Sequence, residues 1–116
     1  MPHPVVHAEI RSSDPDTTRE FFAQLFGWTY SAPPGGFPTY TFVDTGVDGA
    51  LPTAIGPVQG MADDVLFFVG VQDVAGTLER AAALGGSVVQ AATEAPGVTF
   101  GVLADPQGHH VGVAAS

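Results

Sequence analysis

The sequence contains two copies of one unit, and this internal repeat restricts the folds open to the chain. An offset of 59 residues aligns Asp14 with Asp73, Leu25 with Leu84 and Gly27 with Gly86. Self-similarity at a fixed period indicates repeated structural units, and the matching order of predicted elements strengthens the few identities. We therefore expect two modules of the same fold in one chain.

The first module, about residues 4–57, is predicted to form a strand, a helix and three more strands. Residues 5–12 are predicted as the first strand. Asp14 is a suitable helix N-cap, Pro15 suits the first helical position, and Gly27 ends the helix. Apolar residues recur between them at helical spacing (Phe21, Phe22, Leu25 and Phe26). The remaining strands are predicted at 28–32, 39–45 and 50–56. A turn rich in proline and glycine is predicted at 33–38.

The second module, about residues 64–116, repeats this order after an exposed, acidic link at 57–64. Its helix begins at Asp73, and two glycines follow Leu84. Its strands are predicted at 65–71, 87–92, 98–104 and 109–115, with a turn at 104–108. Each module is then βαβββ, which gives a single α+β domain over 1–116. We expect two curved sheets around a cleft, with the helices outside.

Composition excludes several classes of protein. Three basic residues stand against twelve acidic ones, for a formal net charge of −9, which disfavours binding to nucleic acid or to anionic membranes. The absence of cysteine excludes disulfides, thiolate metal sites and a cysteine nucleophile. With Arg19 and Arg80 expected to face solvent, a phosphate-recognising site is disfavoured. No signal peptide or membrane span is predicted, so we expect a cytoplasmic protein.

Two stretches carry a family resemblance: VVHAEIRSSDPDTTREFFAQLFGW at 5–28 and ADPQGHHVG at 104–112. Together with the repeated βαβββ order, they resemble the vicinal oxygen chelate superfamily, which includes glyoxalase I, bleomycin resistance proteins, fosfomycin resistance enzymes and extradiol dioxygenases. The resemblance extends from about Val5 to Ala114. It implies the fold, but the superfamily is too diverse for the fold to select a reaction.

The resemblance also implies where a metal would bind. Enzymes of the superfamily hold one divalent metal through the first and last strands of each module. In this sequence the four corresponding positions are occupied by His7, Thr53, Leu66 and Gly112. Only His7 is a good ligand, because leucine and glycine have no coordinating side chain. We therefore expect the usual metal site to be lost.

A rebuilt site is the alternative. His7 and Glu9 point to the same face of a strand, and the resemblance places His110 on the cavity face as well. These three residues could bind Zn, Ni, Fe or Mn, act as a metal-free acid/base group, or form a hydrogen-bonded polar patch. A buried Glu9 requires a partner, so a histidine or Arg11 is expected beside it. His3 and His109 are predicted to lie at the surface.

Aromatic and apolar side chains on the strands form the second candidate feature. Tyr40 and Phe42 share one strand face, and Leu66 and Phe68 share another. With Phe100, they could contact a flat organic ligand, although packing in the core is the competing interpretation for each. Phe37, in the loop 33–40, is a candidate lid residue.

Two functions follow from these features. The first is a small-molecule-binding protein of the bleomycin resistance type, which holds an apolar or aromatic compound in the cleft without metal. The second is a lyase, isomerase or dioxygenase-like enzyme with a metal at His7, Glu9 and His110. A specialised domain with neither role is a third. Uncovered strand edges and helix faces also predict a homodimer.

Overall fold

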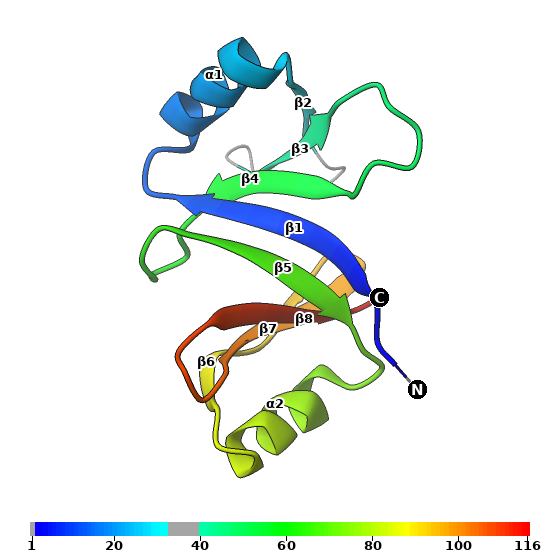
Figure 1. Cartoon of the computed structure of the whole chain (residues 1–116), viewed down its shortest axis with the longest axis vertical. Helices are drawn as coiled ribbons and strands as arrows, with labels where there is room; N and C mark the ends of the chain where they lie inside the picture. The colour runs from blue at the N-terminus through cyan, green and yellow to red at the C-terminus, as the bar shows by residue number, and fades with distance from the viewer. Residues whose placement is uncertain (1, 33–39) are drawn as a thin grey trace. The chain divides into compact units, whose positions relative to one another are not determined.

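The computed structural model describes residues 2–32 and 40–116 (Figure 1). The chain divides into two compact units. We call His7–Val65 the N-terminal unit, and Met1–Val6 with Leu66–Ser116 the C-terminal unit. The elements are β1 (Val5–Ser12), α1 (Pro15–Phe26), β2 (Thr29–Ser31), β3 (Thr41–Asp44), β4 (Thr53–Pro57), β5 (Asp64–Gly70), α2 (Val74–Ala83), β6 (Ser87–Ala95), β7 (Val98–Ala104) and β8 (His110–Ala115).

The order of these elements confirms the α+β class and the two βαβββ modules. In the N-terminal unit the strand order is β2-β3-β4-β1, with β1 and β4 parallel and the other pairs antiparallel. In the C-terminal unit it is β5-β8-β7-β6, with β5 and β8 parallel. The single domain over 1–116 and the cleft between curved sheets stay predictions.

Both helices begin where the sequence predicts. The Asp14 carboxylate accepts a hydrogen bond from the Thr17 backbone N–H, and the Asp73 carboxylate accepts one from Gly76. Gly27 ends α1 in the left-handed region at φ 72°, a conformation that glycine adopts without a steric cost. Across the described part of the chain, neither helix has the length and apolar character needed to cross a lipid bilayer.

Several strand boundaries differ from the predicted ones. Strand β6 continues three residues further, to Ala95, because its pairing with β7 resumes after register shifts between Val88 and Thr93 and ends at Ala95 opposite Val98. Strand β4 begins at Thr53 rather than at residue 50. The link also differs, since Met61 is half-buried rather than exposed.

The two units differ in how their helices pack. In the C-terminal unit, Val74 and Leu78 of α2 form a buried core with Val113, and half-buried neighbours surround it (Val71, Leu103 and Ala115). In the N-terminal unit, Ile55 of β4 is fully buried, and α1 contacts β4 without burying any of its own residues. The apolar side of α1 therefore remains largely at the surface.

Candidate functional site

Three polar side chains of β1 lie on the face of the N-terminal sheet away from α1. Side chains alternate along a strand, so His7, Glu9 and Arg11 share one face. On the opposite face the Ser12 hydroxyl lies 2.7 Å from the Thr18 hydroxyl of α1. The three residues thus form the inner wall of their unit, on the side that the helix does not cover.

Arg11 and Glu9 form a buried ion pair. Nε of Arg11 donates to Oε2 of Glu9 at 2.6 Å, and the two side chains are 0% and 6% exposed. The expectation that a buried Glu9 would pair with a histidine or with Arg11 is confirmed. Nη1 of Arg11 also lies 4.0 Å from Sδ of Met61, which brings the link residue onto the pair. The pair offsets the large cost of burying each charge alone.

Tyr40 joins this pair to His7. Its hydroxyl donates to Oε1 of Glu9 at 2.9 Å and lies 3.3 Å from Nε2 of His7. The Tyr40 hydroxyl directs its single proton to Glu9, and its contact with His7 depends on the tautomer of the imidazole. Arg11, Glu9, Tyr40 and His7 therefore make a continuous hydrogen-bonded chain, which we call the β1 network.

Burial sets the protonation of this network. Burial and the Glu9 carboxylate raise the pKa of Tyr40 well above its ordinary value, so its hydroxyl stays a donor. Burial lowers the pKa of His7, while the Glu9 carboxylate and a hydrogen bond to the Pro52 backbone oppose that shift. The network thus holds one ion pair and one neutral phenol beside an imidazole whose pKa is lowered.

The β1 network was only partly foreseen from the sequence. The sequence indicates Tyr40 for its aromatic ring, whereas in the structure its hydroxyl makes the contacts of the network. The signal was Gly56 inside strand β4, because a Cβ there would collide with the Tyr40 ring. A glycine within a strand often marks such a close approach.

Tyr40 and Phe42 form an aromatic pair beside the network. Their ring centroids lie 5.9 Å apart in an edge-to-face arrangement, which fits the predicted shared face. Phe42 remains 39% exposed and can still contact a ligand. Phe37, the candidate lid residue, lies outside the described residues.

The C-terminal unit has its own aromatic face. Leu66 and Phe68 are both buried, and the Phe68 ring lies 6.5 Å from that of Phe100. Phe68 pairs in register with Gly112, and its ring occupies the space that a side chain at position 112 would need. The neighbouring Val113 points to α2, so this face lies away from the helix.

The residues at the four positions implied for a metal do not fit one. Leu66 is buried and apolar, and the Phe68 ring covers Gly112. The Thr53 hydroxyl donates to the Leu51 carbonyl. Within residues 2–32 and 40–116, no group of three or more acidic or histidine side chains is arranged to hold a metal ion.

The rebuilt site at His7, Glu9 and His110 stays a prediction. His7 and Glu9 belong to the N-terminal unit, where both carboxylate oxygens of Glu9 have hydrogen-bond donors. His110 is exposed in the C-terminal unit, on the same strand face as Gly112.

The other two histidines lie at the surface, as predicted. His3 is exposed. Nδ1 of His109 lies 2.9 Å from Oδ2 of Asp105 within the turn before β8. Hydrogen bonds from the backbone and side chain of His109 lower the pKa of Asp105. These contacts hold the turn and carry no sign of a ligand site.

Comparisons with known proteins agree with this architecture. The family model described as Glyoxalase-like domain matches residues 7–114. Among curated proteins, none matches the sequence.

Solved structures show the same fold at low sequence identity. A glyoxalase/bleomycin resistance protein/dioxygenase superfamily member from Vibrio splendidus 12B01 is 15% identical with a TM-score of 0.61, over 99% of this chain and 100% of that one. A hypothetical protein from Bacillus halodurans C-125 is 11% identical with a TM-score of 0.64, over 100% of this chain and 96% of that one. A variant of Streptomyces coelicolor methylmalonyl-CoA epimerase in complex with 2-nitronate-propionyl-CoA is 18% identical with a TM-score of 0.57. The match covers 97% of this chain and 94% of that one. On the match over residues 7–114, this chain belongs to the glyoxalase-like domain family.

Proposed function

We propose that this protein binds a small, flat organic molecule without using a metal ion. One observation carries the proposal: both oxygens of Glu9 already accept hydrogen bonds, from Arg11 and from Tyr40, inside the N-terminal unit. A carboxylate held in this way is a poor metal ligand, because binding a cation would break a buried ion pair. The inner wall is then a surface for recognition.

Aromatic contact is the second part of the proposal. Phe42 offers a partly exposed ring held edge-to-face by Tyr40, so its orientation is fixed before a ligand arrives. In the C-terminal unit, Phe100 is a separate half-buried candidate, and its ring lies 6.5 Å from that of the buried Phe68. We propose that Phe42 contacts the ligand within the N-terminal unit and that His7 orients the polar group of the ligand.

The competing function is a metal-dependent lyase, isomerase or dioxygenase-like enzyme. It would place Zn, Ni, Fe or Mn at His7, Glu9 and His110. A metal on Oε2 of Glu9 would displace Arg11 and leave that cation buried without its partner, and a metal on Oε1 would displace the Tyr40 hydroxyl. Breaking a buried ion pair in this way costs about 3–5 kcal/mol.

Two measurements on tag-free protein separate these functions. The first is a ¹H–¹⁵N correlation titration with indole, with 2-naphthol and with its saturated counterpart decahydro-2-naphthol. We expect shifts at residues around Phe42 with the two aromatic probes and weaker shifts with the saturated one. The second is elemental analysis of the purified protein, with thermal melting in Zn²⁺, Ni²⁺ and Mn²⁺.

A matched pair of variants completes the test. Phe42→Ser should weaken binding of the aromatic probes, while Val47→Ser, at another exposed apolar position of the same unit, should not. Stoichiometric metal that is lost in His7→Ala would overturn the metal-free proposal. Equal shifts with saturated and aromatic probes would overturn the aromatic part of it.

We also propose that the protein is a homodimer. Strands β2 and β6 end the strand order of their units and leave backbone groups open for pairing. Exposed apolar side chains such as Val65, which is 71% exposed, offer further contact area. Gel filtration with light scattering should give twice the mass of the chain, and a monomer at all concentrations would contradict the proposal.

A further inference from the structure

One side of helix α1 is apolar and open to solvent. Phe21, Leu25 and Phe26 are 58%, 58% and 57% exposed, and none of the residues of α1 is buried. Helix α2, by contrast, buries Val74 and Leu78. Contiguous apolar side chains at the surface mark interaction sites more often than single exposed residues do.

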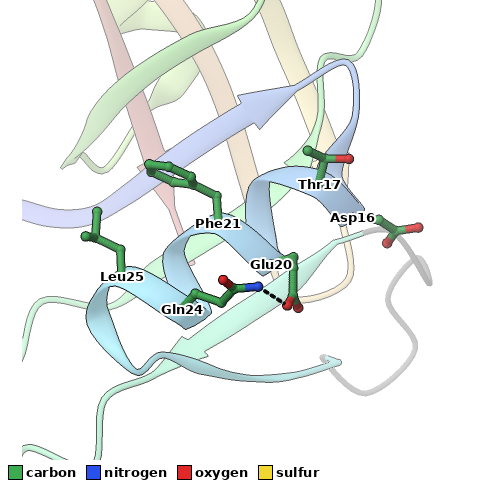
Figure 2. Close-up of a pocket in the computed structure, with 6 residues that line it drawn as sticks. All are labelled: Asp16, Thr17, Glu20, Phe21, Gln24 and Leu25. Carbon is green, nitrogen blue, oxygen red and sulfur yellow. Dashed lines mark hydrogen bonds between the residues drawn. The ribbon is translucent and has the colours of Figure 1, made fainter.

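Two of these side chains, Phe21 and Leu25, line a shallow hollow along the helix. It has a volume of about 670 Å³ and is lined by six residues: Asp16, Thr17, Glu20, Phe21, Gln24 and Leu25 (Figure 2). Phe21 and Leu25 lie one turn apart, so they form a ridge on the surface of the helix. We call this hollow the α1 groove.

The apolar wall of the groove is held in place by other aromatic rings. Phe21 lies edge-to-face on Phe22 at 5.1 Å. Phe22 stacks on Phe26 at 5.6 Å and lies 5.4 Å from Trp28. A ring fixed in this way loses little conformational freedom when a partner packs against it, which favours binding.

The rim of the groove is acidic. Asp16 and Glu20 are its charged residues, and both are exposed. Arg19 pairs with Asp16, but its side chain is only 13% exposed, contrary to the expectation that it would face solvent. The chain has twelve acidic residues against three arginines, of which Arg11 is also buried. A partner for this surface must therefore bring the positive charge.

We propose that the α1 groove docks a basic amphipathic helix of a partner protein. Its apolar side chains would pack against Phe21 and Leu25, and its lysine or arginine residues would reach Asp16 and Glu20. Helix-in-groove binding with anchors one turn apart is a common recognition mode. A second copy of this chain fits less well, because among its described residues it offers this rim only Arg80 as an exposed cation, and both copies carry the charge of −9.

The probe is a synthetic leucine–lysine peptide of about 14 residues, long enough for about four helical turns. It is titrated into the full chain and followed by calorimetry and by ¹H–¹⁵N correlation spectra, beside a leucine–glutamate peptide of the same pattern. We expect the lysine peptide to bind with shifts at the α1 amides, and the glutamate peptide not to bind. The variants Phe21→Ser and Leu25→Gln should each weaken binding at least about fivefold.

Matched controls separate the groove from general charge attraction. Val47→Ser and Asp48→Asn change exposed residues of the same unit away from α1 and should leave the affinity unchanged. Glu20→Gln should weaken binding and reduce its salt dependence. Equal affinity in all variants, or shifts away from α1, would overturn the proposal. So would a dimer that dissociates in both Phe21→Ser and Arg80→Gln, since the groove would then hold a second copy.

Discussion

Arg11 reaches back along strand β1 to Glu9, two residues earlier, and the pair is buried within the N-terminal unit. Adjacent residues of one strand face make a compact pair, which needs no other element to supply the opposite charge. Glu9 is therefore paired within its own strand, and the Tyr40 hydroxyl adds a second donor from outside that strand.

Replacing Arg11 should destabilise the protein strongly. In Arg11→Met the Glu9 carboxylate stays buried without its cation, and we expect a loss of about 3–5 kcal/mol in the free energy of unfolding. Urea denaturation followed by circular dichroism measures it. The double variant Glu9→Gln/Arg11→Met should recover part of the loss because no charge remains. If the loss in the double variant equals the sum of the losses in the two single variants, the two side chains do not depend on each other.

Removing the Tyr40 hydroxyl should cost more than removing that of Tyr30. Tyr40→Phe takes a donor from the buried Glu9 carboxylate, for an expected loss of about 1–3 kcal/mol. The Tyr30 hydroxyl donates to the Arg19 carbonyl, a neutral acceptor, so Tyr30→Phe should cost about 0.5–1.5 kcal/mol. Urea midpoints of the two variants, measured side by side, make the comparison. The opposite ranking would contradict the role of Tyr40 in the β1 network.

A methyl group at position 112 should be poorly tolerated. In Gly112→Ala the new Cβ meets the Phe68 ring, and we expect a loss of about 1–3 kcal/mol from overpacking. Gly70→Ala is the matched control in the same unit, since its nearest neighbour is a Val6 methyl at 3.1 Å. Thermal melting should show a larger decrease for Gly112→Ala. In a Phe68→Ala background the same change should cost little, and an unchanged penalty there would refute the clash.

The Asp14 cap should stabilise α1 in a pH-dependent way. Hydrogen bonds from the Thr17 side chain and backbone lower the pKa of Asp14 below its ordinary 3.8. A carboxyl with a lowered pKa contributes stability above the ordinary value, and this contribution is lost as pH falls through the lowered one. Asp14→Ala should therefore reduce the urea midpoint at pH 7, and the difference from the wild type should shrink below pH 3.8. Asp48→Ala serves as an exposed control, and a difference that persists in acid would contradict this account.

Local signals in the sequence explain how much of the fold was predictable. Asp14, Pro15 and Gly27 determine where α1 starts and ends, because capping and positive φ depend on neighbouring residues alone. The end of β6 was missed because strand length depends on pairing with β7 across two register shifts, which no local pattern contains. Among contacts between distant residues, the approach of Tyr40 to β4 did have a local signal, which was Gly56.

The candidate site also has a part that local sequence patterns predict and a part that they do not. The shared face of His7 and Glu9, and the need for a cation beside Glu9, follow from strand alternation and from the cost of a buried charge. The Tyr40 hydroxyl on Glu9 joins residues 31 positions apart in the chain, and alternation within one strand cannot place it. The exposure of Phe21 and Leu25 was likewise hidden, since their helical spacing resembles that of a core-facing side.

The Phe68 ring over Gly112 has a consequence for how this chain can evolve. A lineage that carries this ring is hindered from placing a carboxylate at position 112 in a single step, because the larger residue enters an occupied space. Position 68 must first change to a smaller residue, and that change alone sacrifices packing. The two positions are therefore epistatic, because the residue that fits at position 112 depends on the residue at position 68.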